Sequence, residues 1–180
     1  MIIQFCGMSG AGKTTLAEHT KAKLERSKIA VEIIDADEFR KFIIKDLGFT
    51  KADRFENIRR LAFIANKFSQ HNIVTIICAI NPYEEIREEI KNKYAQVKTI
   101  FINCEMPELI KRDTKGLYKK AALPEDHKDK IHNLTGVNDP FEKPLHPDLT
   151  IDTHMENIET STDKIVSFIK NNVQESTYKK

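Results

Sequence analysis

A segment near the N-terminus has the residue types and the spacing of a phosphate-binding loop. Positions 7–14 read Gly-Met-Ser-Gly-Ala-Gly-Lys-Thr, which matches G-x-x-x-x-G-K-[ST] in full. Glycines let such a loop curl, so that its backbone N–H groups point at phosphate oxygens beside the positive end of a helix dipole. We expect Lys13 to reach the terminal phosphates and Thr14 to ligate Mg²⁺. The motif predicts binding of a nucleoside triphosphate, through Gly7, Ser9, Gly10, Ala11, Gly12, Lys13, Thr14 and Thr15.

Two aspartates follow the second apolar run of the chain. Asp35 and Asp37 flank Ala36 directly after residues 31–34. Carboxylates at this edge of a parallel sheet lie where open α/β sheets bind their ligands, and in an extended chain both would point to the same side. One could hold a Mg²⁺-bound water while the other accepts a proton from an attacking hydroxyl. Asp37 could instead cap the next helix, and that role is compatible with a catalytic one.

A second group of polar residues lies on a predicted helix. Arg54 and Asn57 are three residues apart, so both can face one ligand, while Ile58 belongs to the apolar stripe of the same helix. By themselves, these residues are more typical of a solvated, charged helix face.

Alternating strand and helix patterns position these residues. Apolar runs at 2–6, 31–34, 73–80, 97–102 and 149–151 are largely continuous, as is typical of strands covered on both faces. Helical stripes lie between and after them, and Thr153-x-x-Glu156 predicts a capping box for the last helix. The stripes are Leu16, Thr20 and Leu24; Ile58, Leu61, Ala62, Ala65 and Phe68; and Ile158, Ile165, Val166 and Ile169. This alternation predicts an α/β fold with a five-stranded parallel sheet and helices on both faces.

The stretch 115–147 interrupts this alternation. It contains Pro124, Pro140, Pro144 and Pro147 and has no sustained apolar period. A long irregular segment inside a compact domain is either a functional lid or a disordered loop, and we favour a lid. The chain length of 180 residues predicts one domain over 1–180, with a frayed tail at 175–180.

Composition excludes several classes of protein. With 29 basic and 27 acidic side chains the net charge is +2, which argues against a protein that coats nucleic acid. No apolar run approaches the ~18–20 residues of a membrane span, and the N-terminus has no secretory pattern. Cys6, Cys78 and Cys104 lack the spacing of a zinc site or a redox pair, so we expect buried thiols and a cytoplasmic location. His127, His132 and His146 also lack metal-ligand spacing, and we expect them to be solvated.

The motifs together resemble the adenylylsulfate kinase family (APS kinases), over essentially 2–153. The matching stretches are GMSGAGKTT at 7–15, D-x-D-x-x-R at 35–40, LGFTKADRFENIRR at 47–60, NPY at 81–83, RDTKGLYKKA at 112–121, and LTGVNDPFEKP with PDL and IDT between 134 and 153. Of these, LGF-x-x-x-DR-x-EN-x-RR and KGLYKKA are far more specific than a phosphate-binding loop alone.

The resemblance implies a P-loop kinase that transfers the γ-phosphate of ATP, with Mg²⁺, to the 3′-hydroxyl of adenosine 5′-phosphosulfate in sulfate assimilation. The product would be 3′-phosphoadenosine 5′-phosphosulfate. Catalytic roles fall on Lys13, Asp35 and Asp37, with Asp37 orienting or deprotonating the acceptor hydroxyl, Thr14 and Asp35 holding the metal, and Arg112 steadying ATP. Arg40, Arg54 and Asn57 would hold the phosphosulfate and ribose, and Phe49 would stack on the base. Ile80, Asn81, Lys119 and Leu134 complete the implied acceptor side.

Some positions depart from the usual family pattern. Ala36 replaces a glycine, Asn81 and Glu84 replace a serine and an arginine, Leu134 replaces an aromatic residue, and the lid is longer around 123–130. We expect these changes to cluster around the second substrate. They leave open a kinase for another 5′-modified nucleotide, such as a cytidine diphosphoramidate kinase of capsule modification, and, more remotely, a non-catalytic nucleotide-binding scaffold.

The positions of the arginines in the sequence support the binding of two anionic ligands. Every arginine except Arg26 falls in a segment that resembles the kinase motifs. Because the guanidinium fork binds phosphate at two points, we expect these arginines to gather around the two nucleotides. The sequence determines neither the acceptor nor the base among the two aspartates; a homodimer is an expectation by family analogy only.

Overall fold

The structure, a computed structural model, describes residues 1–177 and contains a five-stranded parallel sheet. The strands lie in the order β2-β3-β1-β4-β5, which confirms the predicted α/β class. Phe5 of the central strand pairs with Cys78 on one side and Ile100 on the other. The strands are β1 (Ile2–Cys6), β2 (Val31–Asp35), β3 (Val74–Cys78), β4 (Val97–Asn103) and β5 (Leu149–Asp152).

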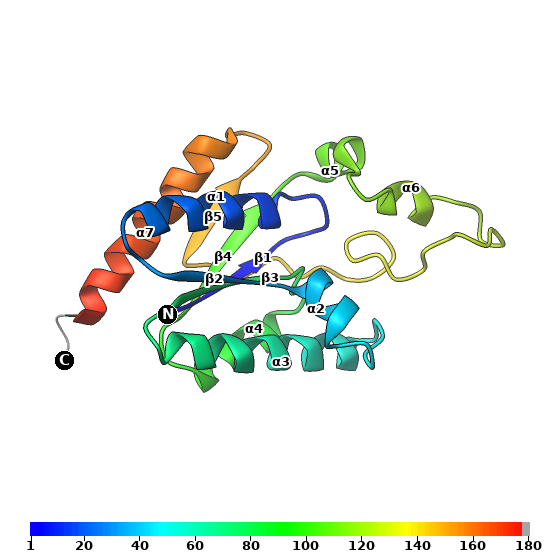
Figure 1. Cartoon of the computed structure of the whole chain (residues 1–180). Coiled ribbons are helices and arrows are strands. Elements are labelled where there is room, and N and C mark those ends of the chain that lie inside the picture. Colours follow the sequence, from blue (N-terminus) through cyan, green and yellow to red (C-terminus); the bar gives the residue numbers. More distant parts are fainter. Residues whose placement is uncertain (178–180) are drawn as a thin grey trace.

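Helices cover both faces of this sheet. In Figure 1, α1 and α7 lie on one face and α3 and α4 on the other, while α2, α5 and α6 lie toward one end of the molecule. That end contains the carboxyl ends of the strands, where open α/β sheets bind ligands. The helices are α1 (Lys13–Arg26), α2 (Ala36–Phe42), α3 (Lys51–Ser69), α4 (Glu84–Lys93), α5 (Met106–Arg112), α6 (Leu117–Ala121) and α7 (Ile158–Thr177).

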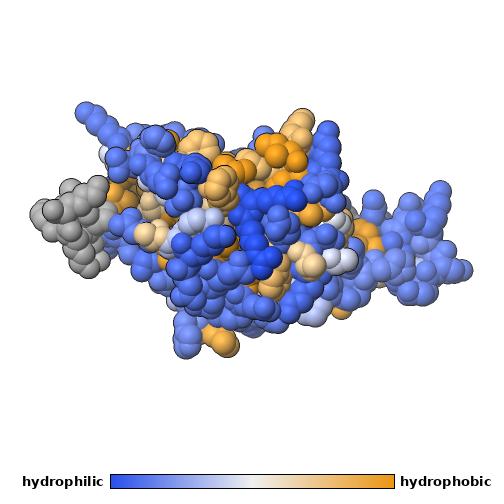
Figure 2. Space-filling model, turned by 90° about the horizontal axis from the view of Figure 1, so that it is seen from below, coloured by the Kyte–Doolittle hydropathy of each residue, from blue (hydrophilic) through white to orange (hydrophobic). Residues whose placement is uncertain are grey.

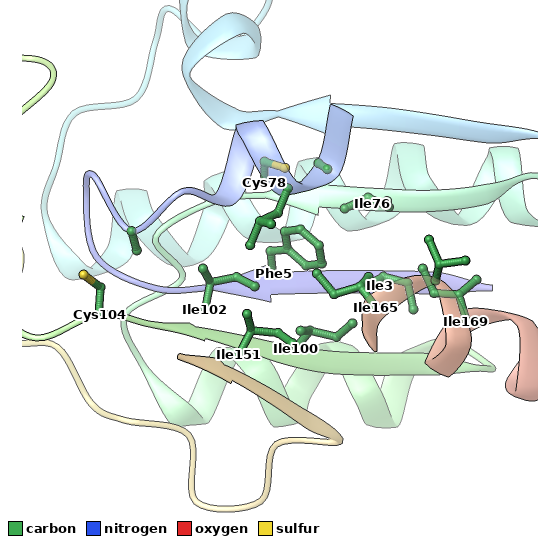
Figure 3. Packing of buried hydrophobic residues seen from close by; sticks show 14 of the residues in the cluster. Ile3, Phe5, Ile76, Cys78, Ile100, Ile102, Cys104, Ile151, Ile165 and Ile169 are labelled. Atoms are coloured by element: carbon green, nitrogen blue, oxygen red, sulfur yellow. The ribbon is translucent and has the colours of Figure 1, made fainter. Parts of the chain in front are cut away.

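Two apolar clusters, one on each face, hold the layers together. Between the sheet and α1 and α7, Figure 3 shows Ile165 and Ile169 of α7 beside Ile3 of β1. On the opposite face, Leu61 and Ala65 of α3 are fully buried against the sheet. Burial on both sides explains why the strand sequences are continuously apolar. The outer surface of that second face is mostly hydrophilic (Figure 2).

The start of α7 differs from the prediction. Asn157 caps this helix, because its Oδ1 accepts a hydrogen bond from Thr160 N at 2.8 Å. The predicted capping box from Thr153 to Glu156 is therefore wrong. The Thr153 hydroxyl instead contacts Ala11 O at 3.0 Å, which attaches the end of β5 to the phosphate-binding loop. Ile158, predicted in the apolar stripe, is 48% exposed.

The stretch 115–147, named the lid segment from here on, is only partly irregular. It contains α6, a short helix that the sequence analysis missed because its apolar residues span less than two turns. Tyr118 of α6 is buried and donates from its hydroxyl to Ser9 O at 2.8 Å. The rest of the segment runs as a long loop beyond α6 before returning to β5 (Figure 1).

The predicted frayed tail is wrong for 175–177, which belong to α7, while 178–180 lie outside the described residues. Within residues 1–177, no helix combines the length and the apolar character that crossing a bilayer requires.

Candidate functional site

A pocket of about 1250 Å³ lies at the carboxyl ends of the strands. The phosphate-binding loop, the start of α2, the start of α3, the lid segment and the β5–α7 turn all contribute to its walls. Most of the predicted site residues meet here. Those lining the pocket are Ser9, Gly10, Ala11, Gly12, Lys13, Thr14, Thr15, Asp35, Asp37, Phe49, Arg54, Ile80, Arg112 and Leu134.

The phosphate-binding loop adopts a backbone that only glycines allow at two points. At Gly12, directly before α1, φ is +97°, in the left-handed region that side chains rarely adopt. At Gly7, which does not line the pocket, an added Cβ would lie 2.3 Å from Ile102 O on the neighbouring strand. The loop can therefore curl tightly between β1 and α1.

Lys13 lies within this curl. Its Nζ donates to Gly7 O at 2.7 Å and to Met8 O at 2.8 Å. Burial lowers the pKa of this ammonium from 10.5 to about 8, and nearby charges modify the effect only secondarily. The loop thus holds a lysine whose proton is less firmly bound than usual, at the position where a triphosphate would supply compensating negative charge.

Thr14 and Asp35 form a second polar contact beside the phosphate-binding loop. Thr14 Oγ1 donates to Asp35 Oδ2 at 2.7 Å, so a hydroxyl and a carboxylate lie together in the pocket. The other Asp35 oxygen accepts from Asp37 N at 2.8 Å, which makes Asp35 the cap of α2. The expected extended stretch from Asp35 to Asp37 is wrong, because helix α2 begins at Ala36. Capping falls to Asp35 and not to Asp37.

Asp37 lies in the first turn of α2 and points to the lid segment. Its Oδ2 forms an ion pair with Nζ of Lys115. Both side chains are exposed to solvent and both line the pocket. A carboxylate that could accept a proton therefore lies next to a cation from the lid segment.

Arginine and aromatic side chains form the opposite wall. Arg54 is 8% exposed, and the Cζ atoms of Arg40 and Arg54 lie 4.7 and 5.7 Å from the centre of the Phe49 ring. Arg40 also donates to Leu47 O and Gly48 O, both at 3.0 Å, outside the lining of the pocket. This wall combines cationic forks with one flat apolar ring.

The lid segment supplies partners for Arg54. Its Nη2 lies 2.7 Å from Asp139 Oδ2 and donates to Asn133 O at 2.9 Å. Leu134, the next residue, is buried and lines the pocket, and Ile80, two residues after the end of β3, lines it as well. The lid segment therefore returns across the wall formed by Arg40, Phe49 and Arg54 before it reaches β5.

Three residues predicted for the acceptor lie behind or beside the pocket lining. Asn57 is 5% exposed and its Oδ1 has no hydrogen-bond partner among the described residues. Asn81 is 2% exposed and donates to Gln4 Oε1 at 3.2 Å, within the interior. Lys119 is exposed on α6, where its backbone N–H donates to Asp113.

Arg112 lines the pocket where the end of β5 meets the phosphate-binding loop. It donates to Thr153 O at 2.8 Å and to the Thr153 hydroxyl at 3.2 Å, and its Nε donates to Glu108 at 3.1 Å. These contacts hold the guanidinium at the pocket edge beside the end of β5.

The expected gathering of arginines is wrong for half of them. Arg59 pairs with Glu89 at 2.6 Å and Arg60 with Asp46 at 2.8 Å, both on the outer side of α3. Arg87 is fully buried in a separate network with Glu84 at 2.6 Å. Arginine forks bind carboxylates as well as phosphates, so residue type alone could not separate structural from ligand-binding arginines. For the same reason Glu84, expected beside the second substrate, lies instead against Arg87.

Comparison with known proteins decides the family. The family model described as adenylylsulphate kinase matches residues 1–152. An adenylyl-sulfate kinase of Microcystis aeruginosa is 40% identical over 159 residues, covering 88% of this chain and 85% of the relative. The chain belongs to the adenylylsulphate kinase family. An adenylyl-sulfate kinase of Gloeothece citriformis is likewise 40% identical, over 91% of this chain and 90% of the relative.

A solved structure of an adenylylsulphate kinase shares the fold. The APS kinase of Mycobacterium tuberculosis, in complex with AMPPNP and APS, superimposes with a TM-score of 0.86 at 29% identity. The match covers 94% of this chain and 96% of that one. The expected family and fold are therefore confirmed, and this chain is a phosphotransferase of that family.

The sequence analysis missed some residues that line the pocket of this family member. Lys115, two residues before α6, lines the pocket, whereas the predicted Lys119 does not. Thr135 and Thr153 also line it, and Thr135 is 1% exposed with a hydroxyl that has no hydrogen-bond partner within residues 1–177. The KGLYKKA stretch was the available signal, because it contains three candidate cations, one before a short helix and two within it. Only the orientation of that helix in the fold shows which of these lysines lines the pocket.

Proposed function

We propose that this protein transfers the γ-phosphate of ATP to the 3′-hydroxyl of adenosine 5′-phosphosulfate, giving 3′-phosphoadenosine 5′-phosphosulfate. The observation that carries the proposal is a single pocket that joins a phosphate-binding loop, two aspartates and an arginine–aromatic wall. Membership of the adenylylsulphate kinase family supports the same reaction. The two halves of the pocket correspond to the two substrates.

The loop and α1 form the donor half. Backbone N–H groups of Gly10 to Lys13 would bind the phosphates, and Lys13 would neutralise the oxygens of the transferred group. Arg112, held by Thr153, would steady the nucleotide from the other side. When Lys13 moves from backbone carbonyls to phosphate oxygens, neutral acceptors are replaced by anionic ones. The negative charge would raise the pKa of Lys13 and so oppose the effect of burial.

Mg²⁺ fits the oxygen atoms of this half. Thr14 Oγ1 and Asp35 Oδ2 lie 2.7 Å apart, and an alcohol with a carboxylate, completed by phosphate oxygens and water, is a typical magnesium environment. No cluster of three or more His, Cys, Asp or Glu suited to a metal occurs among residues 1–177, so a shared protein–nucleotide site is the form expected. When bound, the ion would neutralise charge that develops on the transferred phosphate.

Asp37 and the arginine wall form the acceptor half. Asp37 would accept the proton of the 3′-hydroxyl as the new O–P bond forms and the bond to ADP breaks. Arg54 and Arg40 would bind the anionic phosphosulfate, with the Phe49 ring against the base. Lys115, paired with Asp37, adds a cation at the point where donor and acceptor meet.

The lid segment would close the pocket over both substrates. Its first part contacts the phosphate-binding loop through Tyr118, and its last part contacts Arg54 through Asn133 and Asp139. Closure would exclude water, so that the phosphate reaches the acceptor hydroxyl and is not lost by hydrolysis.

A second acceptor, a cytidine-linked nucleotide, is favoured by one observation. Phe49 is the single aromatic residue lining the pocket within the described part of the chain, and Leu134, where the family pattern has an aromatic residue, is aliphatic and also lines it. A smaller pyrimidine needs less stacking area than adenine.

Parallel turnover assays test both acceptors. ADP release from ATP is measured with adenosine 5′-phosphosulfate and with cytidine diphosphoramidate, each with Mg²⁺ and with excess EDTA. We expect turnover with the adenosine acceptor and loss of turnover with EDTA. Selective turnover of the cytidine acceptor would replace the proposed substrate, and full activity in EDTA would contradict the roles of Thr14 and Asp35.

We also propose a cytoplasmic location, a single domain and a homodimer. The free, buried thiols of Cys6, Cys78 and Cys104 support a reducing compartment. Light scattering coupled to size exclusion measures the oligomeric state directly.

A further inference from the structure

Arg87 in α4 connects two chain segments that are distant in sequence. Its side chain is 1% exposed. Nη1 donates to Asn81 O at 2.6 Å, Nη2 donates to Glu142 O at 2.8 Å, and Nε donates to Glu84 Oε2 at 2.8 Å. One buried guanidinium thus binds the β3–α4 turn, the first residue of α4 and the last part of the lid segment.

Two glutamates complete this connection. Glu142 Oε2 accepts from Glu84 N at 2.7 Å, and Glu142 N donates to Pro82 O at 2.8 Å. Glu84 Oε1 accepts from Leu145 N at 3.2 Å. We name Glu84, Arg87 and Glu142 the lid clamp, because their side-chain and backbone bonds tie 81–87 to 142–145.

The lid clamp lies directly behind the acceptor half of the pocket. Ile80, which lines the pocket, immediately precedes Asn81, whose carbonyl the clamp binds. In the lid segment, Leu134 lines the pocket and Asp139 pairs with Arg54, shortly before the clamp at Glu142. The clamp therefore fixes the end of the 133–142 stretch, which contributes to the acceptor wall.

The turn itself has an independent attachment. Ile80 O accepts from Gly7 N at 3.1 Å, and Asn81 Nδ2 donates to Gln4, so β1 holds the turn without the clamp. Outside the clamp, 133–146 is held by Arg54, by Lys91 Nζ, which donates to His146 O at 3.4 Å, and by the stacking of Phe141 on Phe101, and none of these contacts reaches the phosphate-binding loop. Loosening the clamp should consequently move the acceptor wall more than the phosphate-binding loop.

We propose that Glu84, Arg87 and Glu142 are positioning residues for the acceptor: they hold 133–146 so that Leu134, Asp139 and Arg54 present a formed acceptor wall. A buried arginine keeps such a geometry only while its anionic partner is present, because an unpaired buried charge is strongly unfavourable. This inference rests on the proposed function for its kinetic readout, but its structural readout needs no substrate.

The test compares Glu84→Gln with the neighbouring Glu85→Gln. Glu85 pairs with Lys51 on the surface at 3.1 Å and is 69% exposed, so it is a matched control without contact to the lid clamp. Two quantities are measured on each full-length variant: hydrogen–deuterium exchange of peptides covering 133–146, and KM for ATP and for adenosine 5′-phosphosulfate.

For Glu84→Gln we expect faster exchange across 133–146 and a KM for the acceptor raised about tenfold, with KM for ATP within about twofold of wild type. Glu85→Gln should match wild type in both. Unchanged exchange in Glu84→Gln, or equal rises of both KM values, would overturn the proposal. If the wild-type protein did not use this acceptor, the exchange result would still decide whether the clamp holds 133–146.

A milder variant guards against a folding defect. Glu142→Ala removes the bond to Glu84 N and keeps the Glu142 carbonyl bound to Arg87. We expect the same selective change, about threefold in acceptor KM. Wild-type values for both exchange and acceptor KM in this variant would count against the clamp.

Discussion

The donor and acceptor halves of the pocket are built in different ways. In the donor half, the lysine and its partners lie close in sequence: Lys13 donates to Gly7 and Met8 of the same loop. In the acceptor half, Arg54 donates to Asn133, 79 positions away, and pairs with Asp139. The contacts of Lys13 are therefore a property of one short segment, to which Asp35 and Arg112 are added from elsewhere, whereas the contacts of Arg54 need the lid segment in place.

The lid segment belongs to both halves. Its beginning is attached to the phosphate-binding loop through Tyr118, and its end is attached to α3 and α4 through Arg54 and Arg87. Because the lid segment contacts both halves, we expect it to respond to both nucleotides. It also implies that changes in the two halves should have separable kinetic effects.

Lys13→Ala should cause the largest loss of activity and should affect the donor half alone. Removing the ammonium takes away the cation that stabilises charge on the transferred phosphate, so kcat should fall by about a hundredfold to a thousandfold. Binding of the acceptor, measured by calorimetry without ATP, should change little. The matched control is Lys21→Ala on the same helix, where the lysine pairs with Glu32 on the surface at 3.6 Å. Full turnover in Lys13→Ala would contradict the mechanism.

Arg54→Lys should disrupt the contacts of the acceptor half while keeping a positive charge at this position. Lysine cannot reach Phe49 O, Asn133 O and Asp139 together as the fork does, so kcat/KM for the acceptor should fall roughly tenfold to a hundredfold. KM for ATP should stay within about twofold of wild type. Arg59→Lys, on the same helix but paired with Glu89, is the control. A comparable loss for ATP would show that the two halves are not separable.

The same contrast explains how much the sequence alone could predict. Gly10, Gly12 and Lys13 of the loop carry their conformation in a contiguous motif, so their place in the pocket followed from the order of residues. The five strands followed from continuous apolar runs, because burial on both faces leaves a direct compositional signal.

Long-range polar partners carried no such signal. Nothing local distinguishes Arg87, bound to Glu84 and Glu142, from Arg54, which faces the pocket. The same holds for Thr153, whose spacing suited a capping box but whose hydroxyl binds Ala11 O instead. These assignments depend on which segments pack together, and a single sequence does not encode that in a readable pattern.

The pH dependence of kcat/KM for ATP should test whether the charge of Lys13 serves the donor half alone. Because burial lowers the pKa of Lys13 to about 8, its ammonium is charged below that pH and increasingly neutral above it. We expect kcat/KM for ATP to fall by about tenfold per pH unit well above pH 8. At saturating ATP, the KM of the acceptor should show no matching transition. A flat profile for ATP up to pH 10 would contradict the role of this charge.

Stability should change in the opposite direction over the same range. Between about pH 8 and 10.5 the unfolded chain holds the Lys13 proton more tightly than the folded one, so the free energy of unfolding rises with pH. Urea unfolding of wild type and of Lys13→Met measures this contribution, and the variant should lack it.

Tyr118→Phe should produce the smallest effect and decide to which half the first part of the lid segment belongs. The change removes only the hydroxyl that donates to Ser9 O at 2.8 Å and keeps the buried ring. Leaving that carbonyl without its donor should lower the free energy of unfolding by about 1 kcal/mol and raise KM for ATP by roughly two- to fivefold. The acceptor KM should not change, since Arg54 and its partners are untouched. Tyr94→Phe, at the far end of α4, is the control. If Tyr118→Phe instead raised the acceptor KM and left that of ATP unchanged, the lid segment would act on the acceptor from both of its ends, and the division into two separately attached halves would fail.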